Sequence, residues 1–104
     1  MGRVADKFFE WNPSTSQDVV GYRVYVDQNT LTYDSAFTEV GDANRVNLGQ
    51  LANEGFEPLV DAEGTYNLGV SALDGVGNES SIAVKAGVFL DFVPPAAPTG
   101  LVVY

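Results

Sequence analysis

The chemistry open to this sequence is set by fourteen acidic side chains and by the lack of cysteine and histidine. Carboxylates can act as general acid and base, or hold a hard cation such as Ca²⁺. A zinc site of Cys and His ligands, or a triad that contains His, needs residues that this chain lacks. A disulfide framework is excluded for the same reason, so cysteine usage says nothing about the redox compartment.

One group of carboxylates comprises Glu54, Glu57, Asp61 and Glu63, in a segment without basic residues. Such a run could suit calcium or a basic partner. Its spacing, however, differs from the D-x-[DN]-x-[DN]-G pattern of a calcium loop. We therefore favour a solvated acidic loop.

A second group of polar residues, Asp74, Asn78 and Glu79, is interspersed with glycine. A cation site is conceivable, but Asp, Asn and Gly are the ordinary residues of turns, and we favour a turn. Asn78-Glu79-Ser80 is also a glycosylation acceptor triplet, which matters only in a compartment that glycosylates.

Nothing in the sequence places two carboxylates around a cleft. Lys85 is a lone amine, which we expect on the outer face of the last strand. We therefore expect no enzymatic activity, no cofactor and no metal.

The elements that position these side chains are predicted to be β-strands, because apolar residues recur at every second position. The alternating segments cover approximately residues 7–11, 20–27, 45–49, 66–73 and 84–91. In the last of them, the expected inner-face residues are Val84, Ala86, Val88 and Leu90. A short helical turn is expected near Leu51–Phe56. Clusters of Gly, Asn, Asp and Pro separate the segments, which predicts an all-β sandwich or barrel.

Four motifs in this order carry a family resemblance. They are Trp11 with the following Asn-Pro-Ser, the run Val-Gly-Tyr-Arg-Val-Tyr-Val at 20–26, Val60 with Tyr66 six residues later, and the loop 74–80. Their order and spacing resemble a fibronectin type III domain, an immunoglobulin-like antiparallel β-sandwich of seven-strand type, over roughly residues 8–92. The family usually has Leu where Val60 stands. The resemblance implies that Trp11 lies between two sheets and that the Tyr66 hydroxyl bonds backbone across a corner.

The core expected from this arrangement is formed by apolar side chains on facing strands. Its signature residues are Phe9, Trp11, Tyr22, Val24, Tyr66, Leu68 and Val70. Without a disulfide, packing alone would stabilise the domain, and removal of Trp11 should cost about 3–5 kcal/mol.

Some aromatic residues are not placed in the core by alternation: Tyr25, Tyr33, Phe37, Phe56 and Phe89. A flat aromatic patch would suit sugar stacking or a protein partner. Equally, Phe89 and Tyr25 could cover each other across strands.

The C-terminal segment does not fit the family pattern. Residues 1–93 form the expected domain, which lacks a normal first strand. Residues 94–104 contain Pro94, Pro95 and Pro98, followed by the strand-like residues Leu101, Val102, Val103 and Tyr104. This segment resembles the Pro-x-x-Pro-Thr-Gly-Leu-x-Val phrase that opens the family's first strand.

Three interpretations compete for residues 94–104. The segment could begin a next domain, fill the first-strand slot of its own domain, or fill that slot in a neighbouring copy. From about Phe92 to Pro98 the chain spans at most roughly 20 Å, whereas the sandwich is roughly 30 Å tall. We therefore do not expect it to fill its own slot, and the other two interpretations remain.

These features favour a non-enzymatic structural module that links copies or adjacent domains into an extended assembly, such as a filament, a virion or a multidomain surface protein. The alternative is a carbohydrate- or protein-binding spacer module of a secreted multidomain bacterial protein. The expected partners are proteins, as a homo-oligomer or tandem array. A net charge of −9 disfavours nucleic acid. No apolar run suits membrane insertion and no signal peptide is visible. The expected location is extracellular, on a cell surface or in a virion.

Overall fold

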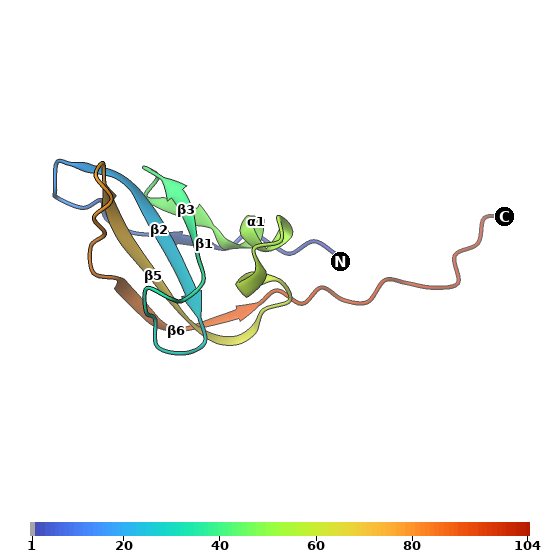
Figure 1. Ribbon diagram of the computed structural model, residues 1–104. Helices are drawn as coiled ribbons and strands as arrows, with labels where there is room; N and C mark the ends of the chain where they lie inside the picture. The colour runs from blue at the N-terminus through green and yellow to red at the C-terminus, as the bar shows by residue number, and fades with distance from the viewer. Residues whose placement is uncertain (1) are drawn as a thin grey trace.

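The computed structural model describes residues 2–104 and contains two antiparallel sheets (Figure 1). The smaller sheet pairs β1 (Phe8–Glu10) with β4 (Arg45–Asn47). The larger sheet has the strand order β3-β2-β5-β6. Its strands are β2 (Val19–Asp27), β3 (Phe37–Gly41), β5 (Glu63–Asp74) and β6 (Ala83–Asp91). The all-β class expected from the period-two pattern is confirmed.

Two short helical elements connect β4 to β5. They are α1 (Leu48–Asn53) and the 3₁₀ turn η1 (Glu57–Leu59). The helical turn expected near residues 51–56 starts earlier, because Asn47 caps α1 and its side chain accepts the Gln50 N–H at 3.3 Å. Gly55, with φ of 90°, follows α1 in a conformation that ends helices.

The hydrophobic core lies between the two sheets and under α1. Its buried members are Val24, Val26, Leu48, Ala52, Leu59, Ala62, Leu68, Leu90 and Phe92. Among the signature residues, Tyr22, Val24 and Leu68 are buried, whereas Val70 is half-buried. The rings of Phe9, Trp11 and Tyr66 are partly buried and pack against this core. Trp11 lies between Phe9 and Tyr22, with ring centroids 5.5 and 5.7 Å away.

The hydrogen bond expected of the Tyr66 hydroxyl is not found among residues 2–104. Tyr22 provides a comparable contact instead, because its hydroxyl accepts the Ser14 N–H at 3.0 Å. Ser14 lies in the loop that joins β1 to β2, so this bond fastens the loop to the first half of β2.

Strand β6 departs from the expected alternation. Val88 pairs with Tyr66, but Lys85 pairs with Leu68, and this register shift is a β-bulge near Gly87, whose φ is 71°. Because side chains alternate with period two, an extra residue exchanges the faces of the positions before it. Lys85 therefore shares the inner face with the buried Leu68, and Val84 points outward. The expectation of Val84 inside and Lys85 outside is wrong.

The loop between β2 and β3 covers part of the outer face of the larger sheet, whereas Val84 and Phe89 on β6 remain exposed. Tyr33 in this loop donates its hydroxyl to the Ser80 carbonyl at 2.9 Å. Beneath the loop, Tyr25 is fully buried and its ring lies 5.3 Å from that of Phe37. Of the alternatives for these aromatic residues, mutual covering of Tyr25 and Phe89 is excluded, because β5 separates their strands.

Candidate functional site

The C-terminal segment, residues 94–104, leaves the domain at the end of β6 and extends away from it (Figure 1). Its apolar end is exposed, with Leu101 and Val103 at 85% and 99% relative exposure. The protein measures 64 × 26 × 20 Å, and the projecting segment accounts for the long dimension. We call residues 94–104 the tail. Residues 99–104, which are strand-like in sequence, have no hydrogen-bonded partner strand among residues 2–104.

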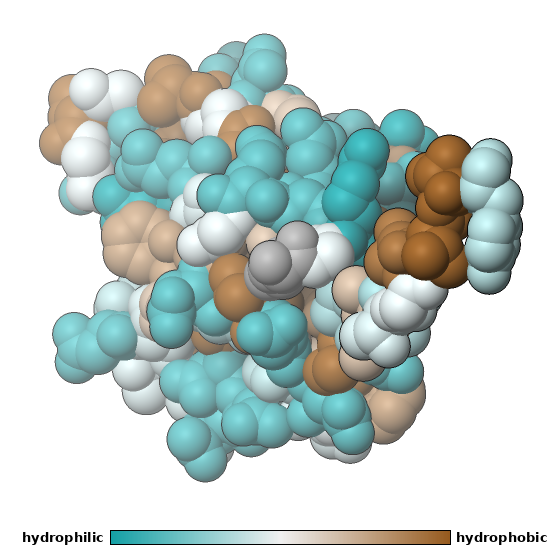
Figure 2. Space-filling view, turned by 90° about the vertical axis from the view of Figure 1, so that its right-hand side faces the viewer, coloured by the Kyte–Doolittle hydropathy of each residue, from teal (hydrophilic) through white to brown (hydrophobic). Residues whose placement is uncertain are grey.

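The composition of the tail suits an interaction element. Pro94, Pro95 and Pro98 fix φ and remove backbone donors, so this part is stiff. No charged side chain occurs between Phe92 and Tyr104. Figure 2 looks at the end of the molecule from which the tail emerges, and shows hydrophobic side chains gathered at one side of a largely hydrophilic face. Exposed apolar surface of this kind is typical of contact sites.

The second feature of the site is the free edge of β1. Trp11 N donates to the Asn44 carbonyl at 3.1 Å, and Leu48 N donates to the Lys7 carbonyl at 2.7 Å. The odd-numbered residues of this segment therefore bond toward β4, and Phe8 and Glu10 direct their backbone groups to the other side. Within residues 2–104, no strand lies along that side. An unpaired edge is a template for an additional strand.

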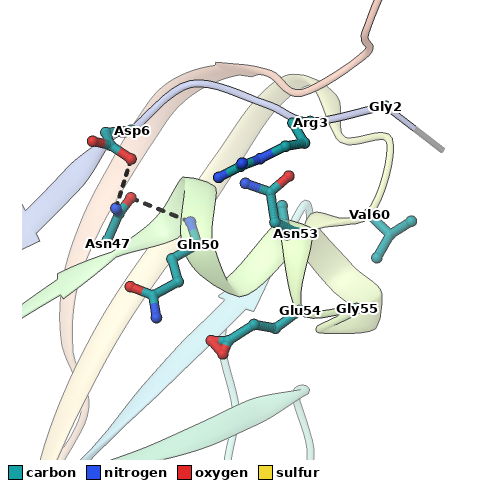
Figure 3. A pocket seen from close by; sticks show the side chains of 10 residues that line it. Gly2, Arg3, Asp6, Asn47, Gln50, Asn53, Glu54, Gly55 and Val60 are labelled. Carbon is teal, nitrogen blue, oxygen red and sulfur yellow. Dashed lines mark hydrogen bonds between the residues drawn. The ribbon is translucent and has the colours of Figure 1, made fainter.

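A polar hollow of about 730 Å³ lies where the N-terminal segment crosses α1 (Figure 3). Asn53 accepts the Val4 N–H at 3.0 Å and donates to the Val4 carbonyl at 3.2 Å. Asn47 donates to the Asp6 carboxylate at 2.9 Å. These amide side chains attach residues 2–7 to the domain. We therefore interpret the hollow as part of the structural contact between the N-terminal segment and α1.

Glu79 forms a polar network that the sequence analysis missed. The Tyr25 and Ser71 hydroxyls donate to its carboxylate, and Arg23 Nη1 lies 2.9 Å from Oε1. Burial opposes ionisation, but these hydrogen bonds and the Arg23 charge prevail and hold the pKa of Glu79 below its ordinary value. Burial and the Glu79 carboxylate raise the pKa of Tyr25. In the sequence, Arg23 and Tyr25 alternate with the inward-facing residues of β2. This alternation was the available indication that both lie on the outer face, where the network forms.

The two acidic groups singled out in the sequence have local structural roles or are exposed to solvent. Asp74 accepts the N–H groups of Val76 and Asn78 and the Asn78 side chain, at 2.8–3.0 Å. The bonds from Asn78 lower the pKa of Asp74, and they form the turn that the sequence predicted. The group comprising Glu54, Glu57, Asp61 and Glu63 is exposed. Within the part of the chain that the structure describes, no three His, Cys, Asp or Glu residues are close enough together to hold a metal ion.

Comparison with known proteins gives no match: no family model, curated protein or solved structure is similar to this chain. In residues 2–104 no helix has the length and apolar character needed to cross a membrane. Function must therefore be inferred from the tail and the free edge of β1.

Proposed function

We propose that this protein is a non-enzymatic module of fibronectin type III-like, immunoglobulin-like sandwich fold, which links copies or adjacent domains into an extended assembly. The observation that carries this proposal is that one chain has both an exposed apolar segment and an unpaired strand edge. The tail exposes an apolar strand-like segment, and β1 has a free edge. A strand donated from one copy to the next satisfies both, because backbone hydrogen bonds and inward side chains act together. A filament, a virion or a multidomain surface protein could use such a module.

The tail is too short to pair with β1 of its own chain, which favours donation between copies. An added strand antiparallel to β1 must start at the end of the domain far from the tail exit. The return path along the nine residues of β6 is about 26 Å. At the polyproline rise, the tail spans about 28 Å between Phe92 and Leu101. This length only covers the return path, so no residues remain for the turn that must precede pairing with β1.

Deletion of residues 98–104 tests this function. Residues 98–104 make no hydrogen bond to the described part of the domain, residues 2–93, so the shortened protein should keep its fold, while self-association of the full chain should be lost. The mass in solution should be measured by analytical ultracentrifugation over a concentration series. Circular dichroism and thermal unfolding of both proteins serve as the control for folding. Equal masses for the full chain and the shortened chain at all concentrations would contradict the proposal.

A carbohydrate- or protein-binding spacer is the second candidate, and it is favoured by the exposure of Tyr33 and Phe89. We rank it lower because Phe37 on β3 and Phe89 on β6 lie on opposite edge strands of the larger sheet, and Arg23 covers the Phe37 ring at 4.5 Å. Retention on a polysaccharide column that is lost in Phe89→Ala would favour this second function.

A further inference from the structure

A small pocket lies between the two sheets at the end of the domain far from the tail exit. Its volume is about 180 Å³. Trp11 at the end of β1, Val70 on β5 and Ala83 at the start of β6 contribute to its lining. Val70 and Ala83 are directly paired across the strands, so both side chains face the space between the sheets.

The part of β6 next to this pocket lacks a covering layer. Ala83 and Lys85 share the inner face with Val70 and Leu68, yet both are exposed. Toward the other end of the strand, Leu90 is fully buried. The core is therefore complete near the tail exit and open at the pocket. One more strand beside β1 would cover this opening.

Trp11, which contributes to the lining of the pocket, also carries an unsatisfied polar group. Its indole Nε1 is buried and has no hydrogen-bond partner in residues 2–104. A buried N–H without an acceptor is costly, and native proteins almost always satisfy such groups. Hydrogen bonding at this end of the core is therefore incomplete.

We infer that this pocket is the docking site for Leu101 of a second copy. This inference rests on the proposed function and specifies the acceptor. Leu101 and Val103 lie on one face of an extended segment, and Val102 and Tyr104 lie on the other. A segment that enters at the pocket and runs antiparallel to β1 places Leu101 beside Trp11 and Val103 farther along β6. The contact is heterologous, because the tail and the pocket occupy opposite ends of the domain.

A complementation experiment tests the inference. Leu101→Asp inactivates the tail and leaves the pocket intact, whereas Ala83→Phe fills the pocket and leaves the tail intact. Ala83 is exposed, so the larger side chain should not disturb the fold, and Ala83→Asp provides a second variant without added bulk. Val102→Asp is the control, since it adds the same charge to the opposite face of the tail. Masses are measured by analytical ultracentrifugation on full-length chains.

The expected result is association of the unmodified protein and of Val102→Asp. Leu101→Asp and Ala83→Phe, each alone, should associate at least about 100-fold more weakly. An equimolar mixture of these two variants should form a one-to-one heterodimer and nothing larger, because only one productive contact remains.

Two other outcomes overturn the inference in different ways. If the unmodified protein associates but Ala83→Phe and Ala83→Asp associate equally well, the pocket is not the acceptor, and the proposed linking function survives. If the unmodified protein stays monomeric at all concentrations, the linking function fails together with the pocket assignment.

Fluorescence gives a second measurement, because Trp11 is the only tryptophan. A synthetic peptide of residues 98–104, which contains no tryptophan, is titrated into full-length Leu101→Asp. We expect a saturable change in Trp11 emission, and no change with full-length Ala83→Phe or with a peptide that carries Leu101→Asp. An unchanged spectrum in the first titration would overturn the docking site.

Discussion

Glu79 is a carboxylate held beneath the outer surface of the larger sheet, with a side chain only 15% exposed. Two hydroxyls and one guanidinium surround it. A buried charge is tolerated only when it is paired and hydrogen-bonded, and this network meets that requirement. Since Glu79 follows the turn at residues 74–78, the network also fixes the loop before β6 against β2.

Replacement of this carboxylate should make stability less dependent on pH. Because the folded pKa of Glu79 lies below the ordinary value of about 4.5, its ionised form stabilises the fold above that pH, and the contribution is lost as the pH falls through the folded pKa. We expect Glu79→Gln to lower the free energy of unfolding by about 1–3 kcal/mol at pH 7 and by less at pH 3. Urea unfolding at both pH values measures the difference.

Glu39→Gln is the matched control for this measurement. Glu39 also contacts Arg23, at 3.1 Å, but its side chain is 61% exposed. An exposed ion pair contributes at most about 1 kcal/mol. Equal effects of the two substitutions at pH 7 would contradict the role given to Glu79.

The N-terminal segment passes close to the backbone of α1 at Gly49. A Cβ added at Gly49 would lie 2.0 Å from the Ala5 carbonyl oxygen, so only glycine fits here. The close approach allows residues 2–7 to continue the pairing of β1 along the start of α1. It thereby sets the position of β1, whose free edge is part of the candidate site.

Gly49→Ala should therefore destabilise the protein, although alanine favours helix over glycine by about 1 kcal/mol. We expect a net loss of about 1–3 kcal/mol in the free energy of unfolding, because the clash is with backbone that cannot rotate away. Gly75→Ala is the control, since the nearest atom to its added Cβ is 3.8 Å away. Thermal and urea unfolding measure both variants, and a neutral or stabilising Gly49→Ala would show that residues 2–7 are not seated as described.

At the scale of the whole molecule, the net charge of −9 opposes association of identical copies. The tail carries no charged side chain between Phe92 and Tyr104, so its docking does not depend on ion pairs. Salt should therefore strengthen the proposed assembly by screening the repulsion between domains.

The expected outcome is a larger weight-average mass at about 150 mM salt than at about 10 mM, because the screening length falls from about 30 Å to about 8 Å. Sedimentation at equal protein concentration measures it, and the chain shortened by residues 98–104 should show no change. Assembly that weakens as salt is added would indicate ion pairing between copies and contradict docking of an apolar strand.

Periodicity in the sequence predicted β1, β2, β4, β5 and β6, because each of them places apolar residues on one face, but it did not predict β3. Turn chemistry likewise predicted the segment around Asp74, since its hydrogen bonds join residues at most four positions apart. The sequence did not predict which side chains in the first part of β6 face the core, because one bulge reverses the inward and outward positions there. Tyr25 was not placed in the core either, because the loop after β2 folds back over it and is held there by a bond from Tyr33 to Ser80, which is distant in sequence.

The sequence by itself therefore determined the all-β class, the core residues Val24 and Leu68, and the unusual composition of the tail. Only the tertiary structure decided that the tail projects, that β1 has a free edge, and that Trp11 borders a pocket with its indole N–H unsatisfied. The physical reason is the range of the interactions. Alternation and turns are local, whereas an open edge or an uncovered face exists only after distant strands have paired.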